Sequence, residues 1–194
     1  MRRVVLMTTV VGSVAAALLV SRLVWSEEHE DEKALLDALS KSKHTLSDGI
    51  QEAAAKSPEA AISGKFELDD GKLSLSVYTV SKGLSVDAEH NVLKELAGSP
   101  DGAKWEPKVE TFTDVPHVSR ASQQLTLMSL ARFSLLDIIK KAQKDQAGTV
   151  FSITPTLHGR KALFVVLVAA GGKVVHLGYD LMTGEPVKTE GDHG

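Results

Sequence analysis

The sequence predicts an α+β protein with two repeated units, each a helix packed on a three-stranded antiparallel β-meander, preceded by an N-terminal hydrophobic helix. Three observations lead to this prediction. An apolar run follows the first three residues, an L-x-D-x-I-x-x-A pattern occurs twice, and strand-like runs separated by turn residues follow each occurrence. The chain has 194 residues, 43% hydrophobic and 24% charged, which is typical of a globular protein.

Charge and cysteine content exclude several classes of function. The formal net charge is -3, and residues 27–194 are more acidic still because the preceding segment holds three arginines and no acidic residue. A basic footprint for nucleic acid is therefore absent, and we expect no nucleic-acid partner. The chain contains no cysteine, which excludes disulfides, thiolate metal sites, a cysteine nucleophile and a lipid-modified cysteine.

The N-terminal segment has the pattern of an export or anchor signal. Arg2 and Arg3 precede an uncharged run of 17 residues from Val4 to Val20. That length lies between the about 7–15 residues of a signal-peptide core and the about 20 of a membrane-spanning helix. Two alternatives therefore stay open, an uncleaved anchor formed by residues 4–25 and a signal peptide cleaved near Ser26.

The flanking charges predict the orientation of this segment. The basic residues at its start favour a cytoplasmic N-terminus. The far side is acidic, with Glu27, Glu28, Glu30, Asp31 and Glu32. We therefore expect residues 27–194 to be periplasmic or otherwise extracytoplasmic in a bacterium, anchored in the inner membrane if the segment is retained and secreted if it is cleaved.

The predicted organisation has five parts. They are a signal peptide or membrane anchor (1–26), an acidic spacer and lead-in helix (27–44), a first repeated unit (45–97), a linker (98–117) and a second unit (118–190).

The repeated pattern predicts one helix per unit. Leu46–Ala53 and Leu135–Ala142 both place apolar residues on one helical face. In the first unit the predicted strands are Ala61–Leu68, Leu73–Thr79 and a short Leu84–Asp87. In the second unit they are Val150–Thr154, Ala162–Ala169 and Lys173–Tyr179.

Each unit ends in a predicted turn that begins with aspartate. Asp87 precedes Asn91, and Asp180 precedes Gly184, by four residues. The aspartate side chain can accept backbone N–H groups, while asparagine or glycine tolerates positive φ.

The region between the two strand sets contains a proline-rich linker and a long helical stretch. That stretch, from Val118 onward, is either one helix of about 25 residues or two helices with a bend near Phe133 and Ser134. In the second case Ser134 caps the second helix, with Asp137 three residues on. Trp105, in the linker, is either a plug over the core or an exposed anchor for a partner.

At these residues the chain resembles the PepSY family of small bacterial α/β modules. The resemblance rests on the helix from Ser134 to Ala142 and on the closing segment from Gly178 to Val187, which contains D-x-x-T-G. The first unit departs from the pattern, because Asn91 replaces the glycine. The resemblance implies an extracytoplasmic module without catalytic residues of its own, which restrains peptidases or forms an accessory part of a membrane protein.

The polar residues form no recognisable catalytic or metal-binding motif. Seven histidines occur without H-x-x-x-H spacing, and the Glu28–Asp31 run is typical of a charged spacer. His158 and His176 are the one pair that could meet across a sheet. Asp69-Asp70 and Gly171-Gly172 both favour hairpin turns. We therefore predict no enzyme, no cofactor and no metal, with no catalytic residues, and the sequence leaves the binding residues unknown.

The function predicted from these observations is non-enzymatic binding or regulation outside the cytoplasm, with restraint of a peptidase implied by the resemblance. The alternative is a structural subunit of a membrane-anchored envelope complex. The partner is expected to be a protein, either a peptidase or an envelope protein. It would contact a sheet edge by strand addition, or a groove between the units.

Overall fold

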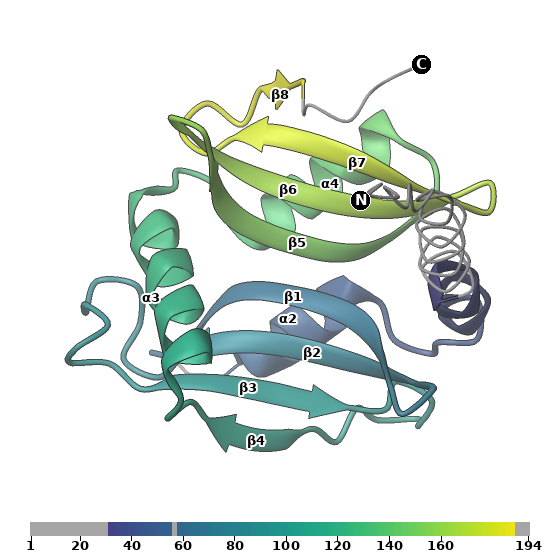
Figure 1. Cartoon of the computed structure of the whole chain (residues 1–194), viewed down its shortest axis with the longest axis horizontal. Coiled ribbons are helices and arrows are strands. Elements are labelled where there is room, and N and C mark those ends of the chain that lie inside the picture. Colours follow the sequence, from purple (N-terminus) through teal and green to yellow (C-terminus); the bar gives the residue numbers. More distant parts are fainter. Residues whose placement is uncertain (1–30, 56–57, 189–194) are drawn as a thin grey trace, which may run out of the picture.

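The computed structural model describes residues 31–55 and 58–188. A helix over residues 31–39 comes first (Figure 1). The elements that follow are α2 (Leu46–Ala53), β1 (Ala60–Asp69), β2 (Lys72–Val80), β3 (Leu93–Gly98), β4 (Lys108–Thr111), α3 (Val115–Leu130), α4 (Leu135–Asp145), β5 (Thr149–His158), β6 (Lys161–Ala170), β7 (Lys173–Asp180) and β8 (Pro186–Val187).

All eight strands form one antiparallel sheet in the order β4-β3-β2-β1-β5-β6-β7-β8. The prediction of two repeated units, each with its own three-stranded meander, is therefore wrong. β1 and β5 pair with each other, with Gly64 opposite Ile153 and Lys65 opposite Ser152. The physical reason is that an isolated three-stranded meander leaves unpaired N–H and C=O groups on its edges, and this pairing satisfies some of them.

The predicted N-terminal hydrophobic helix lies outside the described residues, as does the anchor or signal segment 1–26. Within the described ranges, none of the helices combines the length and apolar character that crossing a bilayer requires.

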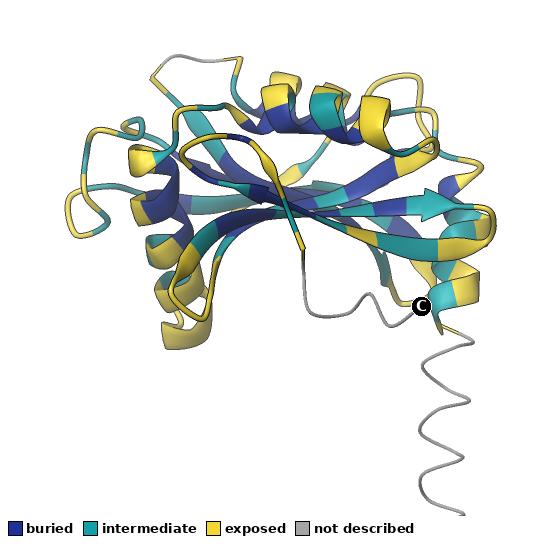
Figure 2. Cartoon of the chain, turned by 90° about the horizontal axis from the view of Figure 1, so that it is seen from above, coloured by how far each residue is buried: buried dark blue, intermediate teal, exposed yellow. Residues whose placement is uncertain are grey.

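Helices cover both faces of the sheet (Figures 1 and 2). A side chain built at Gly64 would meet Leu46 and Ile50 of α2, whereas the adjacent Ser63 hydroxyl donates to Gln124 Oε1 of α3 at 2.8 Å. Because successive strand residues point to opposite faces, α2 and α3 lie on opposite sides. α4 lies beside α2, and the helix over residues 31–39 lies on the α3 side at the other end of the sheet.

The core lies on both faces of the sheet, beneath the α2/α4 layer on one side and beneath α3 on the other. α2 approaches the sheet closely, since a Cβ at its Gly49 would lie 2.6 Å from Leu75 Cδ2. The largest fully buried side chains are Trp105, Tyr179, Phe164, Leu46, Ile62, Leu75, Leu125, Ile138, Ile139, Ile153, Leu163 and Leu181.

α2 and α4 begin with the same capping box. Ser134 accepts from the backbone N–H of Asp137, whose carboxylate accepts from the Ser134 N–H in return. Thr45 and Asp48 make the same pair of bonds in α2. These bonds satisfy backbone donors that a helix start otherwise leaves unpaired. Of the two alternatives for the long helical stretch, the bent one is confirmed, because α3 ends at Leu130 and α4 begins after its Ser134 cap.

The third strand of the N-terminal half is not where the sequence predicted it. Leu84–Asp87 lies in a loop, and the strand is Leu93–Gly98, which pairs with β2 from Leu75 to Val80. Asn91 closes the loop through its amide, which donates to the carbonyl oxygens of Gly83 and Val86. The predicted role of Asn91 as a positive-φ residue is wrong, since Asp70 is the one non-glycine residue with positive φ in the described chain.

Candidate functional site

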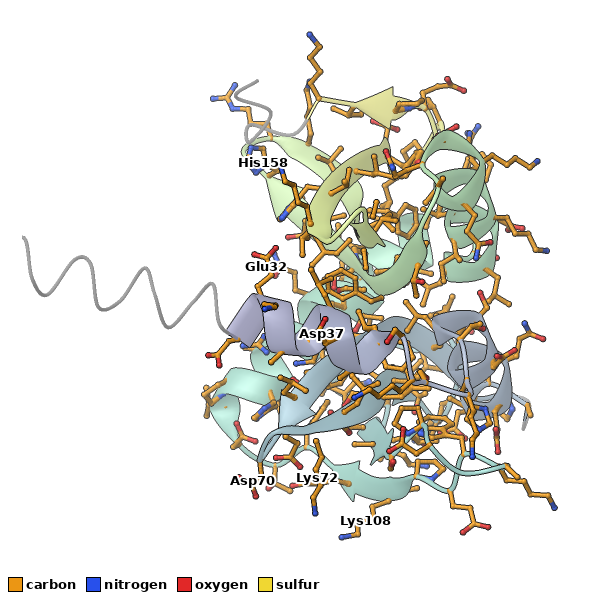
Figure 3. All side chains as sticks on the ribbon, turned by 90° about the vertical axis from the view of Figure 1, so that its right-hand side faces the viewer. Glu32, Asp37, Asp70, Lys72, Lys108 and His158 are labelled. Atoms are coloured by element: carbon orange, nitrogen blue, oxygen red, sulfur yellow. The ribbon has the colours of Figure 1, made fainter. Side chains whose placement is uncertain are left out.

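The two edges of the sheet differ in chemistry. β4 is four residues long, every residue is exposed, and Lys108 and Glu110 are charged. Lys108 points away from the sheet at this end, beyond the Asp70–Lys72 turn (Figure 3). A short, charged edge of this kind resists pairing with another strand. At the opposite edge β8 pairs only with Gly178 and Tyr179 of β7, which leaves the outer side of β7 from Lys173 to Leu177 without a strand among the described residues.

Main-chain groups of β7 point outward along this uncovered stretch. The Asp180 N–H donates across the edge to the Glu185 carbonyl oxygen at 2.9 Å. Backbone groups along an antiparallel strand alternate in direction, so the N–H and C=O of Val174 and His176 point the same way as those of Asp180. The flanking Val174, Val175 and Leu177 are half-buried aliphatic residues. This stretch therefore combines unpaired backbone groups with apolar side chains.

A hollow of about 660 Å³ lies beside the β7 edge, lined by β7, β8 and the end of α4. The phenol of Tyr179 donates to Asp145 Oδ2 at 2.9 Å and connects the two elements. Burial, together with this hydrogen bond to a carboxylate, raises the pKa of Tyr179 well above its usual range. The hydroxyl therefore stays protonated and keeps α4 in place beside the edge.

The turn that precedes β8 is the one predicted from Asp180 and Gly184. Asp180 Oδ1 accepts the N–H groups of Met182 and Thr183, both at 2.9 Å, and these bonds lower the pKa of Asp180. Gly184 has φ 66°, so it adopts the positive φ that the sequence predicted for this position and that glycine tolerates. The turn brings the chain back against the end of β7, where the uncovered stretch begins.

A second hollow of about 350 Å³ lies between the end of α2, the start of β1 and the junction of α3 with α4. We call it the α2/α4 groove. Its apolar lining comes from Ile50, Ala54, Ala60, Ala61, Leu84, Met128, Ala131, Phe133, Leu135 and Leu136.

Two charged side chains line the α2/α4 groove. Glu59, whose side chain is 16% exposed, accepts from the Thr79 hydroxyl at 3.0 Å and lies 3.6 Å from Lys94 Nζ. Arg132 is exposed at the bend between α3 and α4 and has no ion-pair partner among the described side chains. The groove is thus apolar, with one compensated carboxylate and one uncompensated guanidinium.

The structure separates the two histidines that the sequence suggested as a pair. His176 lies level with Leu167 of β6, which lies opposite Ser152 of β5. His158 is six residues further along β5, about 20 Å away at the rise of a strand. Across the described ranges, no group of three histidine, aspartate or glutamate side chains is placed to hold a metal. Most of the Glu28–Asp31 run lies outside these ranges.

The remaining candidates have structural roles. Asp70 and Gly71 form the β1–β2 turn, with φ 48° and 74°, and Gly171 and Gly172 form the β6–β7 turn. Of the two alternatives for Trp105, the plug over the core is confirmed. The side chain is 1% exposed, and its indole N–H donates to the Gly98 carbonyl oxygen at 3.3 Å. The apolar residues between Leu125 and Ile139 are mostly buried in the core.

Sequence reasoning did not single out Asp145, Glu59 or Arg132. Each is a charged residue at the end of, or between, regular elements, where such residues are common. Asp145 and Glu59 are distinguished by contacts with residues far away in the chain, and Arg132 by its place in a groove built from several segments. No local pattern encodes either.

Comparisons with known proteins add one distant likeness. No family model matches the chain, and no curated protein matches it. A solved structure of a candidate lipoprotein from Clostridium difficile 630 aligns with 76% of this chain and 92% of its own, at 14% identity and a TM-score of 0.39. A likeness at that TM-score carries no conclusion about fold or function.

Proposed function

We propose that this protein is a non-enzymatic binding protein of the bacterial envelope, which restrains a peptidase by taking up an extended segment of it as a strand beside β7. The observation that carries the proposal is the outer side of β7 from Lys173 to Leu177, which pairs with no strand in residues 31–55 and 58–188. Strand addition obtains its affinity from main-chain hydrogen bonds, and half-buried aliphatic neighbours add apolar contact.

β8 supports an antiparallel arrangement of the bound segment. It is itself a short strand added to this edge, with Val187 opposite Gly178 and Pro186 opposite Tyr179. A segment that continues in the same direction would pair with His176 and Val174 through their outward N–H and C=O groups. The charged β4 edge offers no equivalent place.

The location outside the cytoplasm is part of the proposal. It is supported by the apolar run after Arg2 and Arg3 and by the acidic residues that follow it. The PepSY resemblance supports both the location and the peptidase as partner.

The test uses the full chain in lipid nanodiscs, immobilised and exposed to a detergent extract of the native envelope, with captured proteins identified by mass spectrometry. His176→Pro removes one outward backbone donor and is expected to abolish capture. His176→Thr keeps that donor and is expected to capture normally, as is Val109→Pro at the β4 edge. Circular dichroism of all three variants checks that the fold is retained, since proline is tolerated on edge strands.

The captured peptidase is then purified and assayed with and without the full chain. A lower rate with the wild type, and an unchanged rate with His176→Pro, is the expected result. Equal capture by His176→Pro and the wild type would contradict strand addition at β7. Capture of a complex without peptidase activity, lost when residues 1–26 are deleted, would favour the structural subunit instead.

A further inference from the structure

The α2/α4 groove has the composition of a binding site for a small apolar ligand. Its volume of about 350 Å³ lies at the small end of the roughly 300–1,000 Å³ typical of ligand sites. Its walls come from four separate segments and are mainly aliphatic, with Met128 and Phe133 at the α3/α4 bend. A site of this size suits one unbranched aliphatic chain better than a two-chain lipid.

The charged side chains at the groove favour a ligand of negative charge. Glu59 is compensated, because it accepts from Thr79 and lies beside Lys94. Arg132 is the lining side chain whose charge has no counterpart among the described residues. An anionic group on the ligand therefore finds a partner at Arg132 and would be repelled near Glu59.

We propose that the α2/α4 groove binds a medium-chain carboxylate, with the aliphatic chain on the apolar walls and the carboxylate at Arg132. A carboxylate matches the planar guanidinium through two parallel hydrogen bonds. Because Arg132 is exposed, the carboxylate stays partly hydrated, and only the aliphatic chain leaves water. This site is distinct from the β7 edge, so the proposal stands independently of strand addition.

The absence of cysteine allows a local reporter in the full chain. Gln51→Cys introduces a single thiol on the groove wall, which is labelled with a trifluoromethyl tag and read by ¹⁹F NMR in lipid nanodiscs. Arg160→Cys, in the exposed β5–β6 turn, carries the same tag as a control for partition of the ligand into the bilayer. The ligands titrated are decanoate, methyl decanoate and decyltrimethylammonium.

Decanoate is expected to shift the Gln51→Cys resonance saturably and to leave the Arg160→Cys resonance unchanged. Arg132→Gln should weaken decanoate binding about fivefold, the upper range for an exposed ion pair, and Arg132→Lys should weaken it less. Ala54→Trp fills the groove from the end of α2 and should abolish the shift. Ala55→Trp, on the neighbouring exposed residue that does not line the groove, should preserve it.

Three results would overturn the proposal. Equal affinity for decanoate and methyl decanoate would show that no carboxylate is recognised. An undiminished shift in Ala54→Trp, with its fold intact by circular dichroism, would place the ligand elsewhere. Equal shifts at the two reporter positions would show partition into the membrane alone. None of these results bears on capture at β7, so the two proposals fail separately.

Discussion

Replacing Gly184 with alanine should destabilise the protein by about 2–4 kcal/mol. Gly184 has φ 66°, where a Cβ costs about 1 kcal/mol or somewhat more. That Cβ would also lie 2.9 Å from Phe133 Cε2 and 3.0 Å from its Cζ, so the ring must move. Overpacking of this kind typically adds about 1–3 kcal/mol. Lys141 Nζ lies over the same ring, 5.7 Å from its centre.

Gly159→Ala is the matched control for this prediction. Gly159 has φ 60°, almost the same backbone conformation, but a Cβ there meets nothing within 4 Å. It should therefore carry the backbone cost of about 1 kcal/mol without the clash.

Urea unfolding of both variants, followed by circular dichroism, measures the difference. For a chain of this size each kcal/mol should also lower Tm by about 2–4 °C. In a Phe133→Ala background the excess cost of Gly184→Ala should vanish, because the clashing ring is gone. If Gly184→Ala and Gly159→Ala lower the free energy of unfolding by the same amount within about 0.5 kcal/mol, the clash with Phe133 adds no cost, which contradicts the prediction.

Three further substitutions test other contacts. Ser134→Ala should cost about 1 kcal/mol at pH 7. Its hydrogen bonds lower the pKa of Asp137, so the share that comes from the ionised carboxylate is present above about pH 4 and fades as the pH falls, which acid unfolding curves measure. Ser63→Ala leaves the buried Gln124 oxygen without its donor and should cost about 1–3 kcal/mol in urea. Tyr179→Phe should reduce the stability lost above about pH 10, because the raised pKa of Tyr179 makes its ionisation oppose folding.

Local features of the fold could be predicted from the sequence because neighbouring residues determine them. The Ser134–Asp137 capping box and the Asp180–Gly184 turn each need only a few consecutive residues, and both form as predicted. The hairpin turns at Asp70-Gly71 and Gly171-Gly172 follow the same rule.

The assembly of these elements could not be predicted in the same way. The pairing of β1 with β5 joins two strands separated by some eighty residues. Neither strand carries a sequence pattern that predicts its pairing partner. The misplaced third strand has a similar origin. Both Leu84–Asp87 and Leu93–Gly98 are short and weakly alternating. The Asn91 side chain, which donates to the carbonyl oxygens of Gly83 and Val86, holds the first segment in a loop, and the second pairs with β2.

The candidate site was predictable only as a type. Any open sheet has free edges, but the sequence did not show that β8 pairs with only two residues of β7 in the described part of the chain, which makes β7 the candidate edge. The α2/α4 groove combines segments from α2, β1, the Leu84 loop and the α3/α4 bend, which no sequence pattern connects.

The contrast between the two sheet edges also bears on self-association. A sheet that is adhesive at both ends can join copies of itself without limit and grow into a fibre. Here β4 presents charged, exposed residues, while β7 from Lys173 to Leu177 carries aliphatic side chains and pairs with no described strand on its outer side. When a second copy pairs with β7, the far edge of each copy is the charged β4 strand. That edge resists pairing with a further strand, so the sheet would not grow beyond this one addition. If a partner binds at β7 as proposed, the charged β4 edge would keep the chain from serving as a template for its own polymerisation.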